Sequence, residues 1–433
     1  MSNNQNSLGK HLKRVRKELG FKQHEITGGE ITRNLISLIE NNKTPLNEKT
    51  AKILAENMNK LLRKSNINMI IDPEDLLNPE RYYAKKKVDQ YINQFESAAS
   101  DRDKEEKIKE IETFLINWDI PDKKTVAFGK IGDYYYSQKE FYKAYIYFIK
   151  AFENSIKISR PTVICTLILK ITRCCLKLEK YDEAIHYSKI VLIYEEIIPE
   201  DLLSKILFNT ALTYYHLELY SHSIDIIRKV EDKLNRIDGQ KLFDLLTLKA
   251  ICYKEMEEYE KGLNIHEKIL TIIDDNLIEK KIIVLVNILN TLYGMNDKER
   301  VSECLNTILE FLNKLPSTNV YLCQIYYEIG CAYKFLDRYN EAEEYFEKSL
   351  EYAERKNNLT IQAKATLNLI DIYKMSNNKK KIDVLKEKVF GLVKKNLIQT
   401  NDNIIFKLIL CYNQLGCIEK SNEIINFILN NKN

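Results

Sequence analysis

Three columns of residues recur along most of the 433-residue chain at a spacing of 39 or 40 residues. The first column is tyrosine in all but one place, and its members are Tyr135, Cys175, Tyr214, Tyr253, Tyr293, Tyr333, Tyr373 and Tyr412. Nine residues later stand Ala144, Ala184, Ser223, Gly262, Ser302, Ala342, Ile382 and Ser421, which are small with one exception. Four residues earlier stand Ile131, Ile171, Thr210, Lys249, Leu289, Ile329, Leu369 and Leu408, mostly apolar. A fixed period of this size is typical of a solenoid, in which each unit buries its apolar face against its neighbours.

Each period of the body, residues 121–433, reads as two antiparallel helices. Pro121, Pro161, Pro199 and Pro316 precede the aligned residues by 14 to 17 positions, and proline suits the first turn of a helix. The small column allows the second helix of each pair to approach the first closely. The sequence therefore predicts an all-α body of about eight helical hairpins.

These columns resemble the tetratricopeptide repeat, which has a small residue three places before the tyrosine and an alanine nine places after it. Gly330, Tyr333 and the run Arg338-Tyr339-Asn340-Glu341-Ala342 form the best copy. The resemblance implies a right-handed superhelix with the first helices on a concave wall. The period near 40 residues, longer than the family's 34, is explained by longer helices.

The first 64 residues differ from the body in charge. They contain 13 Lys/Arg and 6 Asp/Glu, a net charge of +7, whereas the rest of the chain carries −3. A small basic segment attached to a near-neutral body indicates that the segment contacts a polyanion.

The same segment, residues 1–64, shows the pattern of a helical bundle. Leu8, Leu12, Val15 and Leu19 follow one another at helical spacing, and a second short helix is expected over residues 22–27. The Gly28-Gly29 pair permits a tight turn, after which Thr32 is placed to cap a third helix. A short helix, a turn and another short helix are the elements of a helix-turn-helix.

The run from Gly20 to Ile26, the run from Ile31 to Glu40, and Pro45 also resemble the Xre/Cro-type repressors. In that family the first turns of the third helix enter the major groove. Position by position, the resemblance implies that Gln23, Thr32, Arg33, Asn34 and Ser37 contact DNA. Arg and Asn can pair bidentately with guanine and adenine, and Lys22 and Lys43 are placed to hold phosphates. We interpret Glu40 as a structural acid that pairs within the bundle. The alternative is a protein-binding bundle with Arg33 and Asn34 as ordinary surface residues.

Residues 65–120 are expected to join the head to the body. Pro73 and Pro79 bound a short linker, and two amphipathic helices are predicted to follow, over about residues 79–99 and 104–119.

The register of the repeats places six polar side chains toward the expected concave wall, namely Lys205, Asn209, Asn287, Gln324, Lys364 and Asn368. Asn can both donate to and accept from a peptide backbone, so it can hold an extended peptide without reading its side chains. A lysine beside the groove is suited to a terminal carboxylate. The alternative is that these are merely solvated residues of the groove.

A Xre-type head joined to tetratricopeptide repeats resembles the RRNPP family, the group of Rap, Rgg, NprR, PlcR and PrgX. The resemblance implies a cytoplasmic homodimeric regulator of the quorum-sensing type. Its double-stranded DNA operator would be palindromic, and a short signalling peptide in the groove would control sporulation, toxin or competence genes. The alternative from the same family is a repeat domain that binds a phosphorelay protein, with DNA binding secondary.

Other classes of function lack support in the sequence. No P-loop, catalytic constellation or set of metal ligands is recognisable, so no catalytic residue, metal or cofactor is expected. The nine cysteines are interpreted as small buried apolar residues, with a redox role of the Cys174-Cys175 pair as the alternative. The six histidines are interpreted as ordinary surface or groove residues. The first residues are polar and no apolar run is long enough to span a membrane, so membrane association is not expected.

Overall fold

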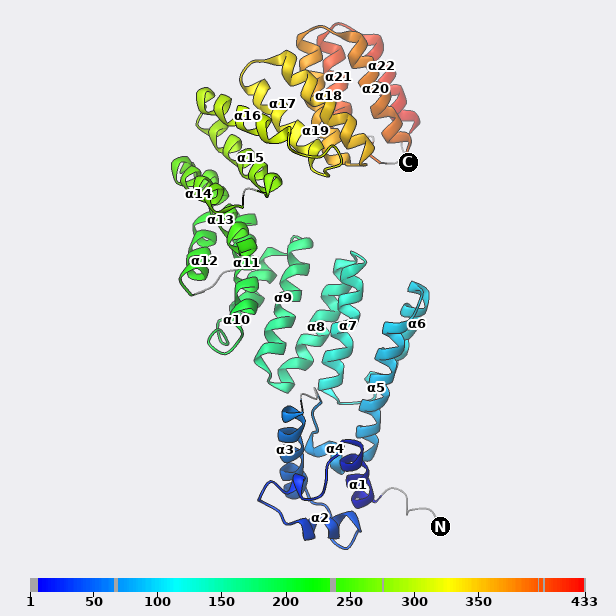
Figure 1. Ribbon diagram of the computed structural model, residues 1–433. Helices are drawn as coiled ribbons and strands as arrows, with labels where there is room; N and C mark the ends of the chain where they lie inside the picture. The colour runs from blue at the N-terminus through cyan, green and yellow to red at the C-terminus, as the bar shows by residue number, and fades with distance from the viewer. Residues whose placement is uncertain are drawn as a thin grey trace. The chain divides into compact units, whose positions relative to one another are not determined.

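The computed structural model describes residues 7–65, 69–233, 239–274, 276–395, 397–399 and 402–431. All regular structure in these residues is helical, with 22 α-helices and one short 3₁₀ helix, η1 (Figure 1). This confirms the predicted all-α fold. The chain divides into two compact units, one up to Thr213 and one from Tyr214 onward.

The first unit begins with the short helices of the head and continues with helical hairpins. Its helices are α1 (Leu8–Glu18), η1 (Glu25–Thr27), α2 (Arg33–Glu40), α3 (Glu48–Lys64), α4 (Pro73–Leu77), α5 (Pro79–Ser97), α6 (Asp101–Ile116), α7 (Pro121–Ser137), α8 (Phe141–Ile158), α9 (Pro161–Lys177) and α10 (Tyr181–Val191). α5 packs on α6, α7 on α8, and α9 on α10. Helix α11 (Glu200–His216) crosses the division between the units.

The second unit consists of further hairpins of the same kind. Its helices are α12 (Tyr220–Lys233), α13 (Gly239–Glu255), α14 (Tyr259–Ile272), α15 (Ile278–Gly294), α16 (Lys298–Leu312), α17 (Leu322–Phe335), α18 (Tyr339–Arg355), α19 (Leu359–Met375), α20 (Lys379–Lys394), α21 (Asn403–Gln414) and α22 (Ile418–Asn430). Each odd-numbered helix from α13 to α21 packs against the helix that follows it.

The turn inside each hairpin repeats in the backbone as well as in the sequence. Three or four residues after each aligned position, one residue adopts a left-handed conformation with φ between 51° and 70°: Lys139, Glu179, Glu218, Glu257, Asn296, Asp337, Asn377 and Gly416. In seven of the eight repeats, the carbonyl of the aligned residue accepts a hydrogen bond from the amide five residues later, as Tyr333 O does from Arg338 N (2.9 Å). This closure reverses the chain and satisfies a carbonyl that the helix end leaves unpaired.

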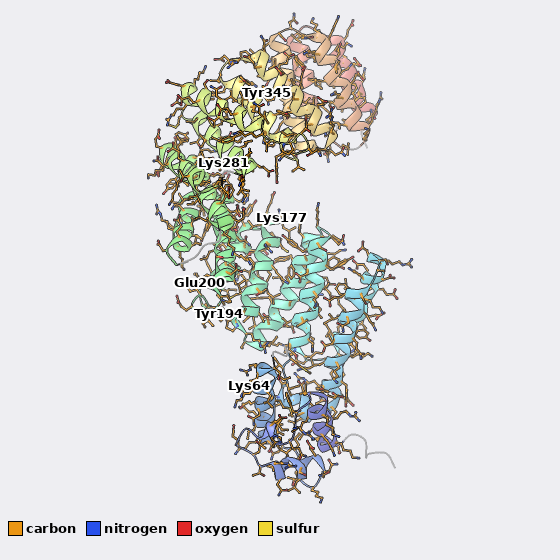
Figure 2. The ribbon with its side chains drawn as sticks, viewed as in Figure 1. Lys64, Lys177, Tyr194, Glu200, Lys281 and Tyr345 are labelled. Carbon is orange, nitrogen blue, oxygen red and sulfur yellow. The ribbon has the colours of Figure 1, made fainter. Side chains whose placement is uncertain are left out.

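The aligned residues pack as the columns predict. Ala144, Ala184 and Ala342 are fully buried, which brings the two helices of a hairpin together. The ring of Tyr333 is buried and stacks on Tyr345 of α18 with centroids 5.4 Å apart. Tyr345 is labelled in Figure 2. One continuous apolar core then runs from α14 to α22.

The head has a separate core. It is built from Leu12 and Val15 of α1, Ile36 and Ile39 of α2, and apolar residues of α3. The same core also includes Ile71, Leu76 and Tyr82. The packing of the head therefore extends beyond α3 into the segment that contains α4 and the start of α5.

Two histidines contradict the interpretation of the six as surface or groove residues. His11 of α1 and His266 of α14 are buried, at 5% and 1% exposure. His266 lies three residues after Leu263, on the core face of its helix. Burial lowers the pKa of His266 to about 4, because the charged imidazolium would lose its hydration there.

We expect acid to destabilise the second unit through His266. The unfolded chain takes up a proton near pH 6.5 and the folded chain only near pH 4, so stability is full above pH 6.5 and falls as the pH drops. Between pH 7 and 4.5 the loss is about 2–3 kcal/mol. Urea unfolding measured by circular dichroism should show this loss in wild type and not in His266→Leu. The matched control is the exposed residue His186: His186→Leu should keep the wild-type slope, and an equal slope in His266→Leu would contradict the assignment.

Candidate functional site

The turn before α2 is held against α3. Gly28 and Gly29 both have positive φ, 60° and 82°. A Cβ on Gly28 would lie 2.1 Å from the side chain of Asn57, so only glycine fits there. Asn57 in turn donates a hydrogen bond to the carbonyl of Ile26 (3.2 Å). These contacts determine where η1 ends and α2 begins.

Helix α2 presents its first turn to solvent. Its N-cap is Thr32, whose Oγ1 accepts a hydrogen bond from the amide of Leu35 (3.2 Å), as the sequence predicted. Ile36 and Ile39 are buried on the opposite side. Because that face packs in the core, Arg33 and Asn34 extend outward and are exposed.

The far end of α2 is anchored by a buried ion pair. Glu40 Oε1 lies 2.5 Å from Arg16 Nε, and Oε2 accepts from Arg16 Nη2 at 2.9 Å. Glu40 is therefore the structural acid that we expected. Gln23 also donates to Glu40 Oε2 (2.8 Å), so in this structure its amide supports the bundle.

The remaining predicted DNA contacts lie around the same helix. Lys22 and Lys43 are exposed, before η1 and after α2 respectively, and Ser37 is half-buried in the middle of α2. Of the predicted DNA contacts, only Thr32, Arg33 and Asn34 therefore lie at the exposed start of α2. Contact of any of these residues with DNA stays a prediction.

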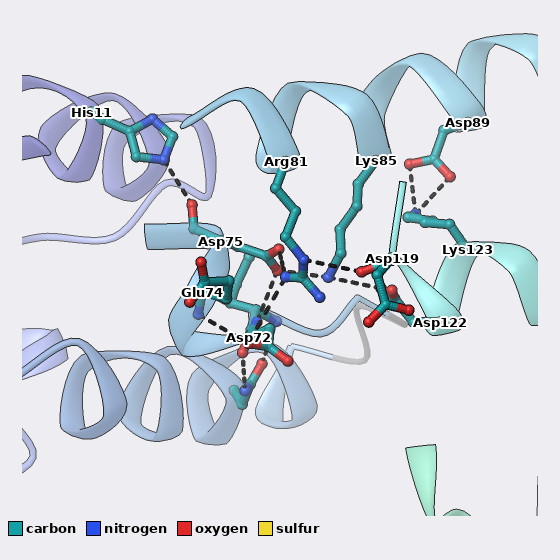
Figure 3. Close-up of polar contacts among 12 residues, drawn as sticks. His11, Asp72, Glu74, Asp75, Arg81, Lys85, Asp89, Asp119, Asp122 and Lys123 are labelled. Atoms are coloured by element: carbon teal, nitrogen blue, oxygen red, sulfur yellow. Dashed lines mark hydrogen bonds and ion pairs between the residues drawn. The ribbon is translucent and has the colours of Figure 1, made fainter. Parts of the chain in front are cut away.

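A buried polar cluster connects the head to the helices that follow it (Figure 3). Its centre is Asp75 of α4, whose side chain is fully buried. Asp75 Oδ2 accepts from Lys85 Nζ of α5 at 2.7 Å, and Oδ1 accepts from Arg81 of the same helix. His11 Nε2 of α1 lies 2.8 Å from the carbonyl oxygen of Asp75.

The cluster continues into the first aligned hairpin. Lys85 Nζ also lies 3.0 Å from Asp122 Oδ2 of α7, and Arg81 Nε donates to the carbonyl of Asp119 (3.3 Å). The carboxylates of Asp75 and Asp122, together with Lys85 and Arg81, therefore link α4, α5 and α7, and His11 adds α1 through the carbonyl of Asp75 (Figure 3). Within the first unit, the head and the start of the repeats are joined by direct contacts.

We expect Asp75→Ala to loosen this connection strongly. Removing the carboxylate leaves two cations, one of them almost fully buried, without their main partner, which costs about 3–5 kcal/mol. Hydrogen exchange of residues 73–97 in the full chain should show the lost protection.

The control for this experiment lies one turn along α5. Asp89 pairs with Lys123 Nζ at 2.6 Å but is half exposed (Figure 3). Asp89→Ala should therefore cost no more than about 1 kcal/mol. If both variants lost protection equally, the cluster at Asp75 would not be what joins these helices.

The first helices of three successive hairpins in the second unit, α17, α19 and α21, share a polar strip. We define the polar strip as Tyr327 and Lys334 of α17, Asn368 and Asp371 of α19, and Lys407 of α21. Asn368 Oδ1 accepts from Lys334 Nζ (2.8 Å), and its Nδ2 lies 3.5 Å from the Tyr327 hydroxyl. Asp371 Oδ2 accepts from Lys407 (2.8 Å) and lies 3.5 Å from Lys334.

Two further predicted residues border the polar strip. Lys364 Nζ lies 5.8 Å from the centre of the Tyr327 ring, and Gln324 donates to Glu328 one turn along α17. Burial raises the pKa of the Glu328 carboxyl, against the opposing effects of Gln324 and Lys364. The strip thus combines an amide, a phenol and charged groups that are only partly buried.

The six residues predicted to bind a peptide do not form one described group. Gln324, Lys364 and Asn368 lie together at the polar strip, and Asn287 is half-buried on α15 of the same unit. Lys205 is exposed on α11 and pairs with Asp201 (2.6 Å). Asn209 was expected on an open wall, but it is only 8% exposed and its Nδ2 lies 3.4 Å from Thr172 Oγ1 of α9. That expectation was wrong because the helix buries this position against the preceding repeat.

Four residues of the polar strip were not predicted from the sequence, namely Tyr327, Lys334, Asp371 and Lys407. Lys334 follows Tyr333 by one place, Asp371 precedes Tyr373 by two, and Lys407 precedes Tyr412 by five. The three charged residues lie near the aligned tyrosines on the first helices of their hairpins, so a search of those helices for charged residues would have found them.

The described part of the chain gives little support for a metal site, a membrane-spanning helix or a reactive thiol. It contains no group of three or more His, Cys, Asp or Glu side chains suited to a metal ion. No helix within it has the length and apolar character needed to cross a bilayer. Burial raises the pKa of both Cys174 and Cys175 to about 12, which keeps these thiols protonated and unreactive at neutral pH.

Comparisons with known proteins identify one of the repeats. The tetratricopeptide repeat family matches residues 324–356, the region of α17 and α18, and this confirms the assignment made from Gly330, Tyr333 and Ala342. No curated protein matches the chain.

Three solved structures illustrate the similarity of this chain to known proteins. The apo quorum sensor NprR from B. thuringiensis is 16% identical with a TM-score of 0.48, over 82% of this chain and 99% of that chain. A tetratricopeptide repeat protein from Parabacteroides merdae is 14% identical, with a TM-score of 0.45 over 67% and 100%. Apo RapI is 17% identical, with a TM-score of 0.43 over 62% and 97%.

Proposed function

We propose that this chain is a DNA-binding transcription regulator that acts as a homodimer and binds a short peptide through its repeats. The observation that carries the proposal is the first turn of α2. Arg33 and Asn34 are exposed there, on a helix held by the Thr32 cap, the Gly28-Gly29 turn and the Arg16–Glu40 ion pair. A rigid helix start with these side chains is suited to reading base edges in a major groove.

The charge of the head supports the same proposal. Residues 1–64 carry a net charge of +7, and the exposed side chains of Lys22 and Lys43 flank α2 in the sequence. Phosphate contacts of this kind position a protein on DNA, whereas base contacts give specificity. A homodimer would present two such heads to a palindromic operator with half-sites about one helical turn apart.

The polar strip supports peptide binding. The amide of Asn368 already pairs with Lys334 on one side and lies close to Tyr327 on the other, so its orientation is restrained before any ligand arrives. A restrained amide can exchange these partners for the backbone of an extended peptide at a small entropic cost.

A connection between the two activities requires that binding at the repeats affects the head. Asp75, Lys85 and Arg81 join the head to the first hairpins through direct polar contacts. In the proposed mechanism, a change in the packing of the hairpins changes the placement of the two heads on DNA.

We expect Arg33→Ala to weaken binding at one base pair by about 1–3 kcal/mol. The operator is first obtained by selecting genomic DNA with the purified protein, and affinities are then measured on all single-base variants. Lys43→Ala is the matched control. Loss of a phosphate contact weakens binding to every sequence equally and lowers the slope of log K against log salt concentration by about one. Uniform weakening by Arg33→Ala would show that this residue does not read a base.

We expect Asn368→Ala to weaken peptide binding about tenfold or more, since about 1–2 kcal/mol is lost with its hydrogen bonds. The ligand is found by selecting a display library of short random peptides on the full-length protein. Titration of an enriched peptide then compares the variants. Asn340→Ala changes an exposed asparagine on the second helix α18 and should have no effect. Equal affinity of the two variants would remove Asn368 from the site.

A further inference from the structure

The last hairpin leaves open a surface that the preceding hairpins bury. Each residue of α21–α22 has an equivalent 39 positions earlier in α19–α20. Two positions on the second helix illustrate the difference. Lys386 and Phe390 of α20 are buried, at 2% and 7% exposure, whereas their equivalents Ile425 and Leu429 of α22 are 40% and 60% exposed.

The first helix of the last hairpin behaves in the same way. Leu367 of α19 packs against the core of the unit, but its equivalent Phe406 is 50% exposed. Leu410 stands at the position of Asp371 and is 59% exposed. We define the terminal face as Phe406, Leu410, Asn422, Ile425 and Leu429.

Charges hold the preceding joint together. Asp371 pairs with Lys407 (2.8 Å), Lys386 with Glu423 (2.6 Å), and Asp383 with Lys420 (3.7 Å). Phe390 stacks on Phe427 in the same joint, with ring centroids 3.8 Å apart. A hairpin that follows α19–α20 therefore has to supply complementary charges.

At the equivalent positions of the terminal face, uncharged side chains stand in place of those charged residues. Asp371, Asp383 and Lys386 become Leu410, Asn422 and Ile425. Other exposed residues of α21 and α22 are also uncharged, among them Asn403, Asn413, Ile418 and Asn426, whereas Glu419 is charged. Three of the four charged residues of α21 and α22, namely Lys407, Lys420 and Glu423, are engaged with the preceding hairpin. The terminal face therefore lacks the charges with which α19–α20 pairs with the hairpin that follows it.

From this exchange we infer that the terminal face is the dimer interface and that its partner is the same face of a second copy of this chain. In a two-fold interface each residue meets a residue of its own patch. A charged patch would then meet like charge, whereas an apolar patch bordered by asparagines meets itself without repulsion. The exposed leucine, isoleucine and phenylalanine side chains supply the apolar area, and asparagine amides can pair with one another across the axis.

The inference rests on the pairing of two chains in the proposed function and specifies where that pairing occurs. Its test is sedimentation velocity of the full-length protein, over about 1–50 μM, a range in which specific dimers of micromolar affinity are populated. Wild type should sediment as a dimer. Leu410→Lys and Leu429→Lys should each weaken the dimer about 100-fold or more, because each substitution places two like charges in one apolar interface.

The control substitutes a residue of similar exposure away from the terminal face. Val384 of α20 is 58% exposed, and Val384→Lys should remain dimeric. Circular dichroism of every variant checks that the helices are retained. A wild type that is monomeric throughout, or a dimer that Leu410→Lys and Leu429→Lys leave intact, would overturn the inference.

A mixing experiment tests the face-to-face arrangement directly. Leu410→Lys and Leu410→Glu should each be monomeric alone and should form a heterodimer when combined. Absence of recovery on mixing would overturn the arrangement. The proposed function can fail separately, because DNA selection and peptide selection can both fail while the chain still pairs through this face. A monomeric wild type would instead remove the homodimer from the proposed function and from this inference.

Discussion

Each hairpin of this protein can bury its apolar face only against a neighbouring hairpin. This constraint explains why the residues that matter recur at 39 or 40 positions, because stacked repeats bury the same positions from one repeat to the next. It also explains the fully buried Ala144, Ala184 and Ala342, where a larger side chain would separate the two helices. The same constraint makes the last hairpin exceptional, since its outward surface has no following hairpin to cover it among the described residues.

The connection between the head and the repeats depends on a different interaction. Asp75 is fully buried and receives hydrogen bonds from two cations of α5. Replacing one member of such a cluster is costly because the others remain desolvated. The cluster therefore favours one arrangement of the head relative to α5 and α7.

The polar strip shows how a repeat architecture produces a binding surface. The core columns are nearly constant, whereas the strip-facing positions vary from helix to helix. Lys334, Asn368 and Lys407 come from three different hairpins and are brought together by Asp371 and direct hydrogen bonds. Stacking thus converts residues far apart in the sequence into one surface whose chemistry can change without affecting the fold.

The sequence by itself determined the all-α fold, the repeat register and the Thr32 cap, because these depend on local periodicity and local capping. The structural role of Glu40 was expected from its resemblance to a family position, and its partner Arg16 lies 24 residues away. The sequence did not reveal that Asn209, His11 and His266 are buried, since the side of a helix that is covered depends on neighbouring elements. The extension of the head core to Tyr82, the cluster around Asp75 and the open terminal face were also decided by tertiary structure. The first two depend on contacts between separate helices, and the third depends on which helix faces the fold leaves uncovered, so no single stretch of sequence carries a signal for them.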